Sequence, residues 1–114
     1  MGLGSLGNLG KLMKKVSKLQ EEMARIQAEA ETKIVEATAG GGAVKVAANG
    51  KGALVSVTIQ PEAIDPSDPT ILEDLIVAAA NEALRQAKEN VSEEMQQLYK
   101  ELGLPAVPGL QGLL

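Results

Sequence analysis

The stretch that decides the fold is Leu9–Ala30, LGKLMKKVSKLQEEMARIQAEA. With Leu9 placed at position a of a heptad, the a positions hold Leu9, Val16, Met23 and Ala30, and the d positions hold Leu12, Leu19 and Ile26. Every a and d position is apolar, and no Pro or Gly interrupts the segment between Gly10 and Ala30, so the pattern predicts a helix. Three heptads suit a short coiled coil, and equally a helix packed on a second helix of one domain.

The outer surface of this helix is cationic in its first half and acidic in its second. The candidate contacts are Lys11, Lys14, Lys15, Lys18 and Arg25, at heptad positions c, f, g, c and c. One interpretation is an ordinary solvated face. The other is contact with nucleic-acid phosphates by compact cations on an exposed helix, repeated by symmetry in an oligomer. No aromatic residue lies between these cations, which argues against base stacking.

The composition predicts a small core that needs a partner. At 114 residues the chain is long enough for one domain. Its hydrophobic residues make up 45%, but Tyr99 is the single aromatic, and Ala and Val bury little area each. Self-association is the expected remedy. The net charge of −4 argues against a wholly basic nucleic-acid coat and leaves room for a local basic patch.

The residues do not support an enzyme. There is no Cys and no His, so the commonest nucleophile and the commonest general base are missing. Glu62, Asp65 and Asp68 fall in a proline-rich connector, where caps and turns explain them and calcium loops would need denser spacing. The glycines of 40–42 and 49–52 lack the spacing of a phosphate-binding loop. We expect no catalytic residue, metal, cofactor or small-molecule substrate.

The ends of the sequence suggest a soluble intracellular protein. The first ten residues, MGLGSLGNLG, lack the charged and continuous apolar regions of a signal peptide. The longest apolar run, IVAAA at 76–80, is too short to cross a bilayer. No membrane contact is expected.

Three strands are predicted after the first helix, which we expect to run from about Leu6 or Leu9 to about Glu31. The strands cover 33–39, 43–48 and 53–60, joined by a glycine turn at 40–42 and by a tight Asn49-Gly50-Lys51-Gly52 hairpin. Asn and Gly are expected to supply the positive φ of that hairpin. The third strand alternates: Val55, Val57 and Ile59 are expected inward, and Ser56, Thr58 and Gln60 outward. These strands predict an antiparallel meander with one buried face.

A second, longer helix is predicted from Pro69 to about Leu102. Asp68 is expected to cap it with its side chain, and Gly103 and Pro105 to end it. About 33 residues at about 1.5 Å each give a helix of about 50 Å. Because a compact domain of this size has a radius of gyration of about 13 Å, the helix must extend beyond its own sheet. The expected organisation is a flexible N-terminus at 1–8, a domain at 9–102, and a flexible Gly/Pro/Leu-rich tail at 103–114.

The order of elements resembles a known family along nearly the whole chain. The features that carry the resemblance are LGKLMKKVSKLQEEMARIQ, the Gly-Gly turn, VKV, the NGKG hairpin, a strand ending in I-x-P-E, the DPSDP connector and LEDLIVAAANEAL at 72–84. The match is densest from Gly41 to Leu84. The chain resembles the YbaB/EbfC family of nucleoid-associated proteins.

This resemblance implies an α+β protomer of order α-β-β-β-α and a tweezer-like homodimer with protruding helices. It also implies double-stranded DNA as the partner and a role in the bacterial nucleoid, in the cytoplasm, or in its chloroplast counterpart, with effects on nucleoid organisation and gene expression. The DNA-contact role of the family's helical arms carries over to the cations of the first helix. A second hypothesis remains open: a dimeric adaptor that holds a protein partner through its helices or through the tail LPAVPGLQGLL.

Overall fold

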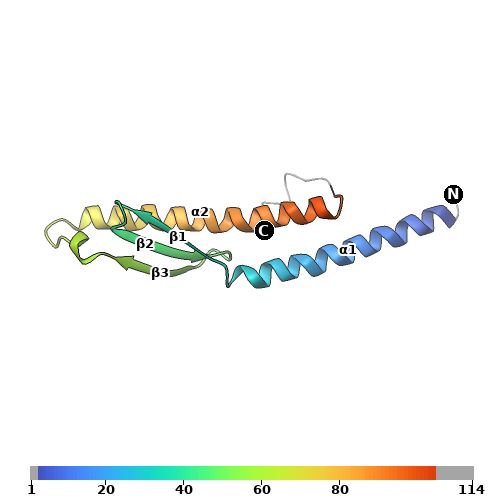
Figure 1. Ribbon diagram of the computed structural model, residues 1–114, viewed down its shortest axis with the longest axis horizontal. Helices are drawn as coiled ribbons and strands as arrows, with labels where there is room; N and C mark the ends of the chain where they lie inside the picture. Colours follow the sequence, from blue (N-terminus) through green and yellow to red (C-terminus); the bar gives the residue numbers. More distant parts are fainter. Residues whose placement is uncertain (1–2, 105–114) are drawn as a thin grey trace.

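The computed structural model describes residues 3–104, with side chains from residue 8 onward (Figure 1). The elements are α1 (Leu3–Ala30), β1 (Ile34–Ala39), β2 (Val44–Asn49), β3 (Leu54–Ile59), a short 3-10 turn η1 (Pro61–Ala63) and α2 (Pro69–Glu101). The predicted order α-β-β-β-α is therefore confirmed. α1 begins at Leu3, earlier than expected, because a glycine in a helix costs only about 1 kcal/mol and does not by itself end it.

The three strands form an antiparallel meander with β2 in the centre. Val44, Val46 and Ala48 of β2 are fully buried, as predicted, but Ala47 on the opposite face is buried too, so the alternation is incomplete. Ala37 of β1 pairs with Val46 and faces the same side, since residues directly opposite in a ladder share a face. Small alanines of α2, at 79, 83 and 87, complete this sheet–helix core.

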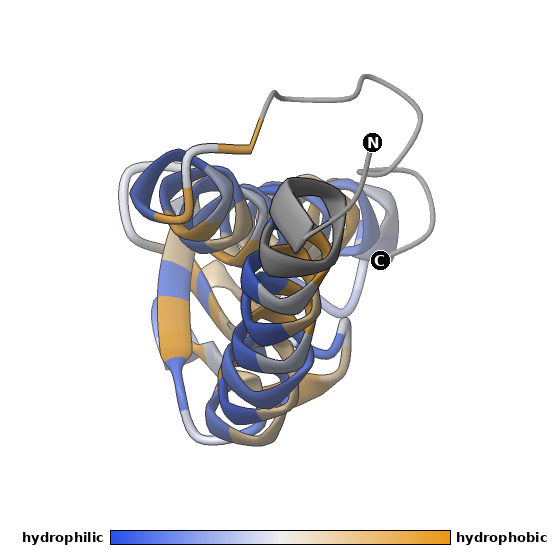
Figure 2. Ribbon diagram, turned by 90° about the vertical axis from the view of Figure 1, so that its right-hand side faces the viewer, coloured by the Kyte–Doolittle hydropathy of each residue, from blue (hydrophilic) through white to orange (hydrophobic). Residues whose placement is uncertain are grey.

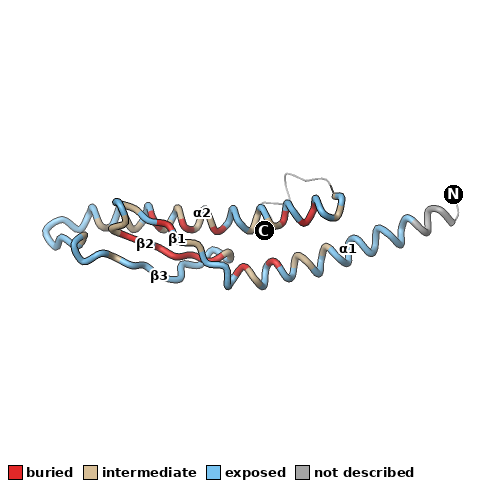
Figure 3. The backbone as a smooth tube through the Cα atoms, in the orientation of Figure 1, coloured by how far each residue is buried: buried red, intermediate tan, exposed pale blue. Residues whose placement is uncertain are grey.

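The inward face expected for β3 is partly wrong. Val57 pairs with Val46 and Ile59 with Val44, so both lie on the predicted face. A bulge at Ala47/Ala48 then places Leu54, rather than Val55, opposite Ala48. Most of this face is exposed in the protomer: Val57 is 44% exposed and Leu54 is 48% exposed, whereas Ile59 is half-buried against the core. α2 packs over β1 and β2 and leaves most of β3 uncovered (Figure 3).

The β2–β3 turn forms as predicted, but Asn49 stabilises it through its side chain and not through a positive φ. Within residues 3–104, positive φ occurs only at glycines, and in this turn it is Gly52 that has it. Asn49 instead ends β2 in a buried position, and its Oδ1 accepts hydrogen bonds from the backbone N–H groups of Lys51 at 3.0 Å and Ala53 at 3.1 Å. The asparagine thus stabilises the turn through its side chain.

The predicted side-chain cap at the start of α2 is absent, whereas the predicted glycine ending is present. Asp68 is the N-cap residue and Pro69 follows it, but the Asp68 side chain makes no capping hydrogen bond. At the other end Gly103 has φ +70°, its N–H donates to the Lys100 carbonyl, and the Leu104 N–H donates to the Tyr99 carbonyl. This pair of bonds is the Schellman ending that a glycine after a helix favours. Pro105, also expected to stop the helix, lies outside the described residues.

The two helices give the molecule an elongated shape, 78 × 23 × 17 Å, with a radius of gyration of 20.8 Å. The sheet covers the first half of α2, and the second half of α2 lies beside the end of α1 nearest the sheet (Figure 1). A second core joins the helices there, formed by Ile26 of α1 with Met95, Leu98 and Tyr99 of α2. α1 then continues beyond the end of α2 as a free arm. α2 extends beyond the sheet, as predicted, and α1 extends further still, beyond the end of α2.

Candidate nucleic-acid interface

The N-terminal half of α1 is an exposed cationic arm. Lys11, Lys14, Lys15 and Lys18 are all exposed, and Lys15 lies level with the end of α2: a side chain at Gly103 would begin 4.0 Å from its ammonium nitrogen. Residues 8–18 of α1 are all exposed, and Figure 3 shows α1 continuing past the end of α2. Long cationic side chains in this position can reach a partner without rearrangement of the fold.

The four lysines share one face of the helix. Their spacing of i, i+3, i+4 and i+7 places them on one side of a helix of 3.6 residues per turn. Apolar residues follow the same spacing on the other side, and Figure 2 shows hydrophilic and hydrophobic residues on opposite sides of α1. The lysines therefore lie on the side of the arm opposite its exposed apolar residues.

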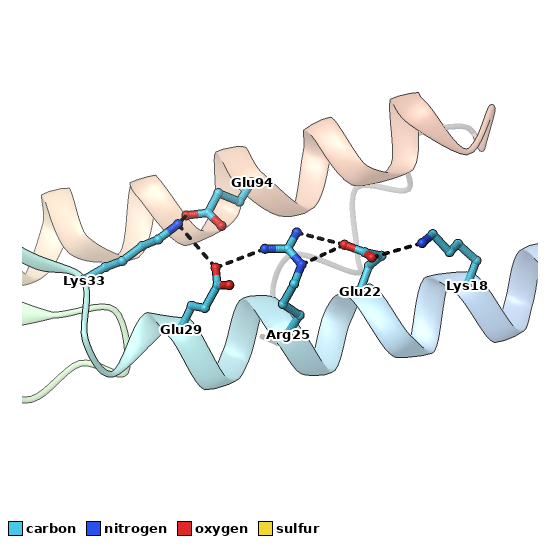
Figure 4. A network of polar contacts seen from close by, with 6 residues as sticks. All are labelled: Lys18, Glu22, Arg25, Glu29, Lys33 and Glu94. Atoms are coloured by element: carbon cyan, nitrogen blue, oxygen red, sulfur yellow. Dashed lines mark hydrogen bonds and ion pairs between the residues drawn. The ribbon is translucent and has the colours of Figure 1, made fainter.

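A chain of ion pairs divides this face into two parts (Figure 4). Glu22 pairs with Lys18 at 3.2 Å and with Arg25 at 2.8 Å. Arg25 also pairs with Glu29 at 3.0 Å, and Lys33 then links α1 to Glu94 of α2. The i,i+3 and i,i+4 spacings within α1 could have been read from the sequence, whereas the link from Lys33 to Glu94 joins residues far apart in the chain.

The ion pairs compensate the charge of Arg25. Hydrogen bonds from Arg25, and next from Lys18, lower the pKa of the Glu22 carboxyl, so Glu22 stays ionised. The same carboxylates, Glu22 first and then Glu29, raise the pKa of Arg25. A phosphate would have to compete with two carboxylates for this guanidinium. Arg25 is therefore a weaker candidate contact than its position in the sequence indicates.

Three of the predicted contacts have no such competitor. Within residues 3–104, no carboxylate lies within ion-pairing distance of Lys11, Lys14 or Lys15. We call these three residues the arm lysines. Lys18 belongs to the same face but is bound to Glu22, so it stands at the boundary between the arm lysines and the ion-pair chain.

Two cations outside α1, Arg85 and Lys45, are compensated by carboxylates, whereas Lys51, Lys88 and Lys100 have no ion pair among residues 3–104. Arg85 of α2 binds Glu82 at 2.6 Å and Glu89 at 2.7 Å. The hydrogen bond from Arg85 is the main cause that lowers the pKa of Glu82 to about 2. On the sheet, Lys45 lies 3.8 Å from Glu36. The middle of α2 and the outer face of the sheet are thus poorer surfaces for a polyanion.

Charge is distributed unevenly along the chain. Residues 1–20 contain four lysines and no acidic residue, a formal side-chain charge of +4, so the remaining residues carry −8 to give the net −4. At physiological salt, electrostatic fields fade over about 8 Å, so a polyanion at the arm responds to the local lysines more than to the distant acidic residues. The N-terminal part of the chain is therefore basic although the net charge of the whole chain is negative.

The structure offers little sign of another kind of site. Among the residues described, no group of three His, Cys, Asp or Glu side chains is placed to hold a metal ion, and neither helix is apolar over a length that could span a membrane. A groove of about 530 Å³ between α1 and α2 is lined by both signs of charge, including Arg25, Lys33, Glu93 and Glu94. Because Glu101 also lines the groove, its acidic side chains outnumber its basic ones, and it does not favour a polyanion.

Known proteins with similar sequences share a consistent description. The profile of the YbaB/EbfC DNA-binding family matches residues 6–102. A nucleoid-associated protein of Pelotomaculum thermopropionicum is 50% identical over 89% of this chain and 96% of its own length. One from Acetivibrio thermocellus is 48% identical over 91% of this chain and 90% of its own. In structure, an uncharacterized protein of Helicobacter pylori has the same fold, with a TM-score of 0.58 over 79% of this chain and 88% of its own, at 24% identity.

Proposed function

This chain belongs to the YbaB/EbfC DNA-binding family, and from that premise we propose that it binds duplex DNA through the arm lysines of α1, as a homodimer. The observation that carries the proposal is the exposed, uncompensated set of Lys11, Lys14 and Lys15 on one face of a free helical arm. Lysine ammonium groups bind phosphates as point charges, which fixes the protein on the duplex without reading its sequence. The role is binding and not catalysis.

The strength of this binding follows from the number of phosphates that the lysines neutralise. Two arms of a dimer present six arm lysines, and about four to six phosphate contacts give a log–log salt slope of about −4 to −5. Binding should therefore be moderate at low salt and largely lost at high salt. Arg25 and Lys18 add to it only where a phosphate displaces Glu22.

A salt series with a labelled duplex tests the proposal. We expect the affinity to fall steeply as the salt concentration rises, with little dependence on base sequence. An adaptor that holds a protein partner through apolar contacts would show no such duplex binding. Absence of duplex binding at low salt, by a sample shown to be folded, would contradict the proposal.

The homodimer is proposed from the apolar surface that the protomer leaves open. β3 is an edge strand whose Leu54, Val55 and Val57 are about half exposed, and Ile71 and Val77 of α2 are more exposed still. An exposed apolar edge strand invites aggregation unless another chain covers it. A second copy, related by a two-fold axis, can cover it and would direct two arms at one duplex. Sedimentation at micromolar concentration tests this, and a monomer mass would contradict it.

The compartment and the domain limits are proposed on the same basis. The relatives named above are nucleoid-associated proteins, so we place this protein at the bacterial nucleoid, in the cytoplasm. The DNA-binding domain spans 9–102, flanked by the segments 1–8 and 103–114. Limited proteolysis should leave residues 9–102 intact if the division is right.

A further inference from the structure

One side of α1 exposes four large apolar side chains in a continuous row. Leu9 is 52% exposed, Leu12 52%, Met13 64% and Val16 45%; we call these four residues the arm stripe. Their spacing of i, i+3, i+4 and i+7 places them on one face of the helix, away from the arm lysines. A contiguous apolar row of this kind on a water-exposed helix indicates a surface that another segment covers.

The arm stripe continues a row that is already covered. Leu19 and Met23, the next apolar residues along this side of α1, are partly buried against the core of Ile26, Met95, Leu98 and Tyr99. Leu102 and Leu104, which follow α2, pack on the same core. The exposed part begins where α2 ends.

The chain leaves α2 at the place where the arm stripe begins. Gly103, with φ +70°, turns the chain after the helix, and the Leu104 N–H donates to the Tyr99 carbonyl at 2.8 Å. Leu104 then packs on the core that joins the two helices. A side chain at Gly103 would begin 4.0 Å from the Lys15 ammonium, so the chain leaves α2 within reach of the arm of α1.

The next ten residues have the composition and the length of a cover. Residues 105–114, PAVPGLQGLL, contain no charge, and most of their side chains are apolar. At about 3.1 Å per residue, ten residues in an extended conformation can reach about 31 Å. From Lys15 back to Leu9 the helix rises only about 9 Å, at about 1.5 Å per residue. The segment is long enough to cover the whole arm stripe.

We propose that residues 105–114 dock on the arm stripe of their own chain and complete the apolar layer that begins at Leu19 and Met23. The tether favours this occupant over a second copy or another protein, because a segment that starts at the edge of its surface has an effective concentration of about millimolar. The proposal concerns the protein without DNA and does not depend on the proposed function. Docking would stiffen the free arm that carries the arm lysines.

Disulfide trapping tests the docking, since the chain has no cysteine of its own. The test protein carries Met13→Cys and Val107→Cys; the control carries Lys14→Cys and Val107→Cys, one residue along but on the lysine face. Under mild oxidant we expect the test protein to form an internal disulfide at least about tenfold faster than the control, because docking selects one side of the helix. Equal rates in the two proteins would overturn the proposal. Disulfide-linked dimers in place of the internal bond would overturn it as well, by showing that a second copy covers the stripe.

A labelling experiment gives an independent readout. In a protein with Met13→Cys alone, we expect a thiol reagent to react at least about tenfold more slowly than in the same protein with Val107→Asp and Leu110→Asp added, since a docked segment exposes the thiol only when it opens. Circular dichroism should be the same for both, because Met13 is exposed in the described structure and the other two changes lie in the segment itself. Equal labelling rates would contradict docking.

Discussion

Replacement of Gly50 by alanine tests the junction from which the arm leaves the sheet. Gly50 lies in the β2–β3 turn, and its N–H donates to the Ala30 carbonyl at the end of α1, at 2.8 Å. A Cβ atom at this position would lie 2.8 Å from Cγ2 of Val91, 2.9 Å from Cβ of Ala30 and 3.0 Å from the Ala30 carbonyl oxygen. The turn is therefore wedged between the two helices with no room for a methyl group.

The expected loss of stability follows from these contacts. One of the three neighbouring atoms is backbone, and the other two are held on helices, so the turn or a helix end has to move. Overpacking of this kind costs about 1–3 kcal/mol, and movement of the turn also weakens the bond to Ala30. A loss of about 2 kcal/mol lowers the melting temperature of a domain of this size by about 8–16 °C.

Thermal unfolding followed by circular dichroism measures the effect. All samples need the same protein concentration, because dimerisation makes the melting temperature depend on it. Gly10→Ala is the matched control: no heavy atom lies within 4 Å of its added methyl, and the interior of a helix favours Ala over Gly by about 1 kcal/mol. The control should melt at or above the parent temperature. A Gly50→Ala protein that melts like its parent would refute the proposed junction.

Three further predictions concern the dimer, pH and the ion pairs. Val57→Asp should give a folded monomer, because Val57 is 44% exposed in the protomer, whereas Ser56→Asp on the other face should remain a dimer; equal masses in sedimentation would contradict this. Glu82 has its pKa lowered from 4.5 to about 2, so its pairing with Arg85 stabilises the fold above pH 4.5 and is lost as the pH falls towards 2. Glu82→Gln should therefore lose less thermal stability than the parent over that range, and parallel losses would argue against the pairing. Glu22→Gln should release a cation for phosphate, tighten DNA binding at low salt and steepen the log–log slope by about 0.9 for each additional phosphate neutralised; unchanged binding would mean that these cations do not reach the DNA.

Periodicity in the sequence predicted the elements well, because each local pattern has one dominant structural cause. The heptad at Leu9–Ala30 predicted α1, the alternation in β2 predicted its buried face, and Pro69 and Gly103 marked the ends of α2. The strand alternation identified residues that share a face of the sheet, but it could not tell which part of that face α2 covers. The exposure of Val57 depends on where α2 lies, and that is a tertiary property.

The candidate site was predictable to a similar degree. The basic face was visible from the spacing of the lysines, and the compensation of Arg25 by Glu22 and Glu29 was also present in the helical spacing. The pair between Lys33 and Glu94 was not, because it depends on how α1 packs against α2. Only the structure shows which cations form ion pairs and which, the arm lysines, do not.

Duplex binding by a charge-matched pair of variants tests the central claim most directly. One variant carries Lys11→Gln, Lys14→Gln and Lys15→Gln; the other carries Lys45→Gln, Lys51→Gln and Lys88→Gln, which remove the same charge from the sheet and from α2. Fluorescence anisotropy with a labelled duplex over a salt series gives the affinity and the slope. We predict that the arm variant loses binding and its salt dependence, while the second variant keeps a slope of about −4 to −5. Equal losses in both variants, or an arm variant that binds like its parent, would contradict the claim that the arm lysines hold the DNA.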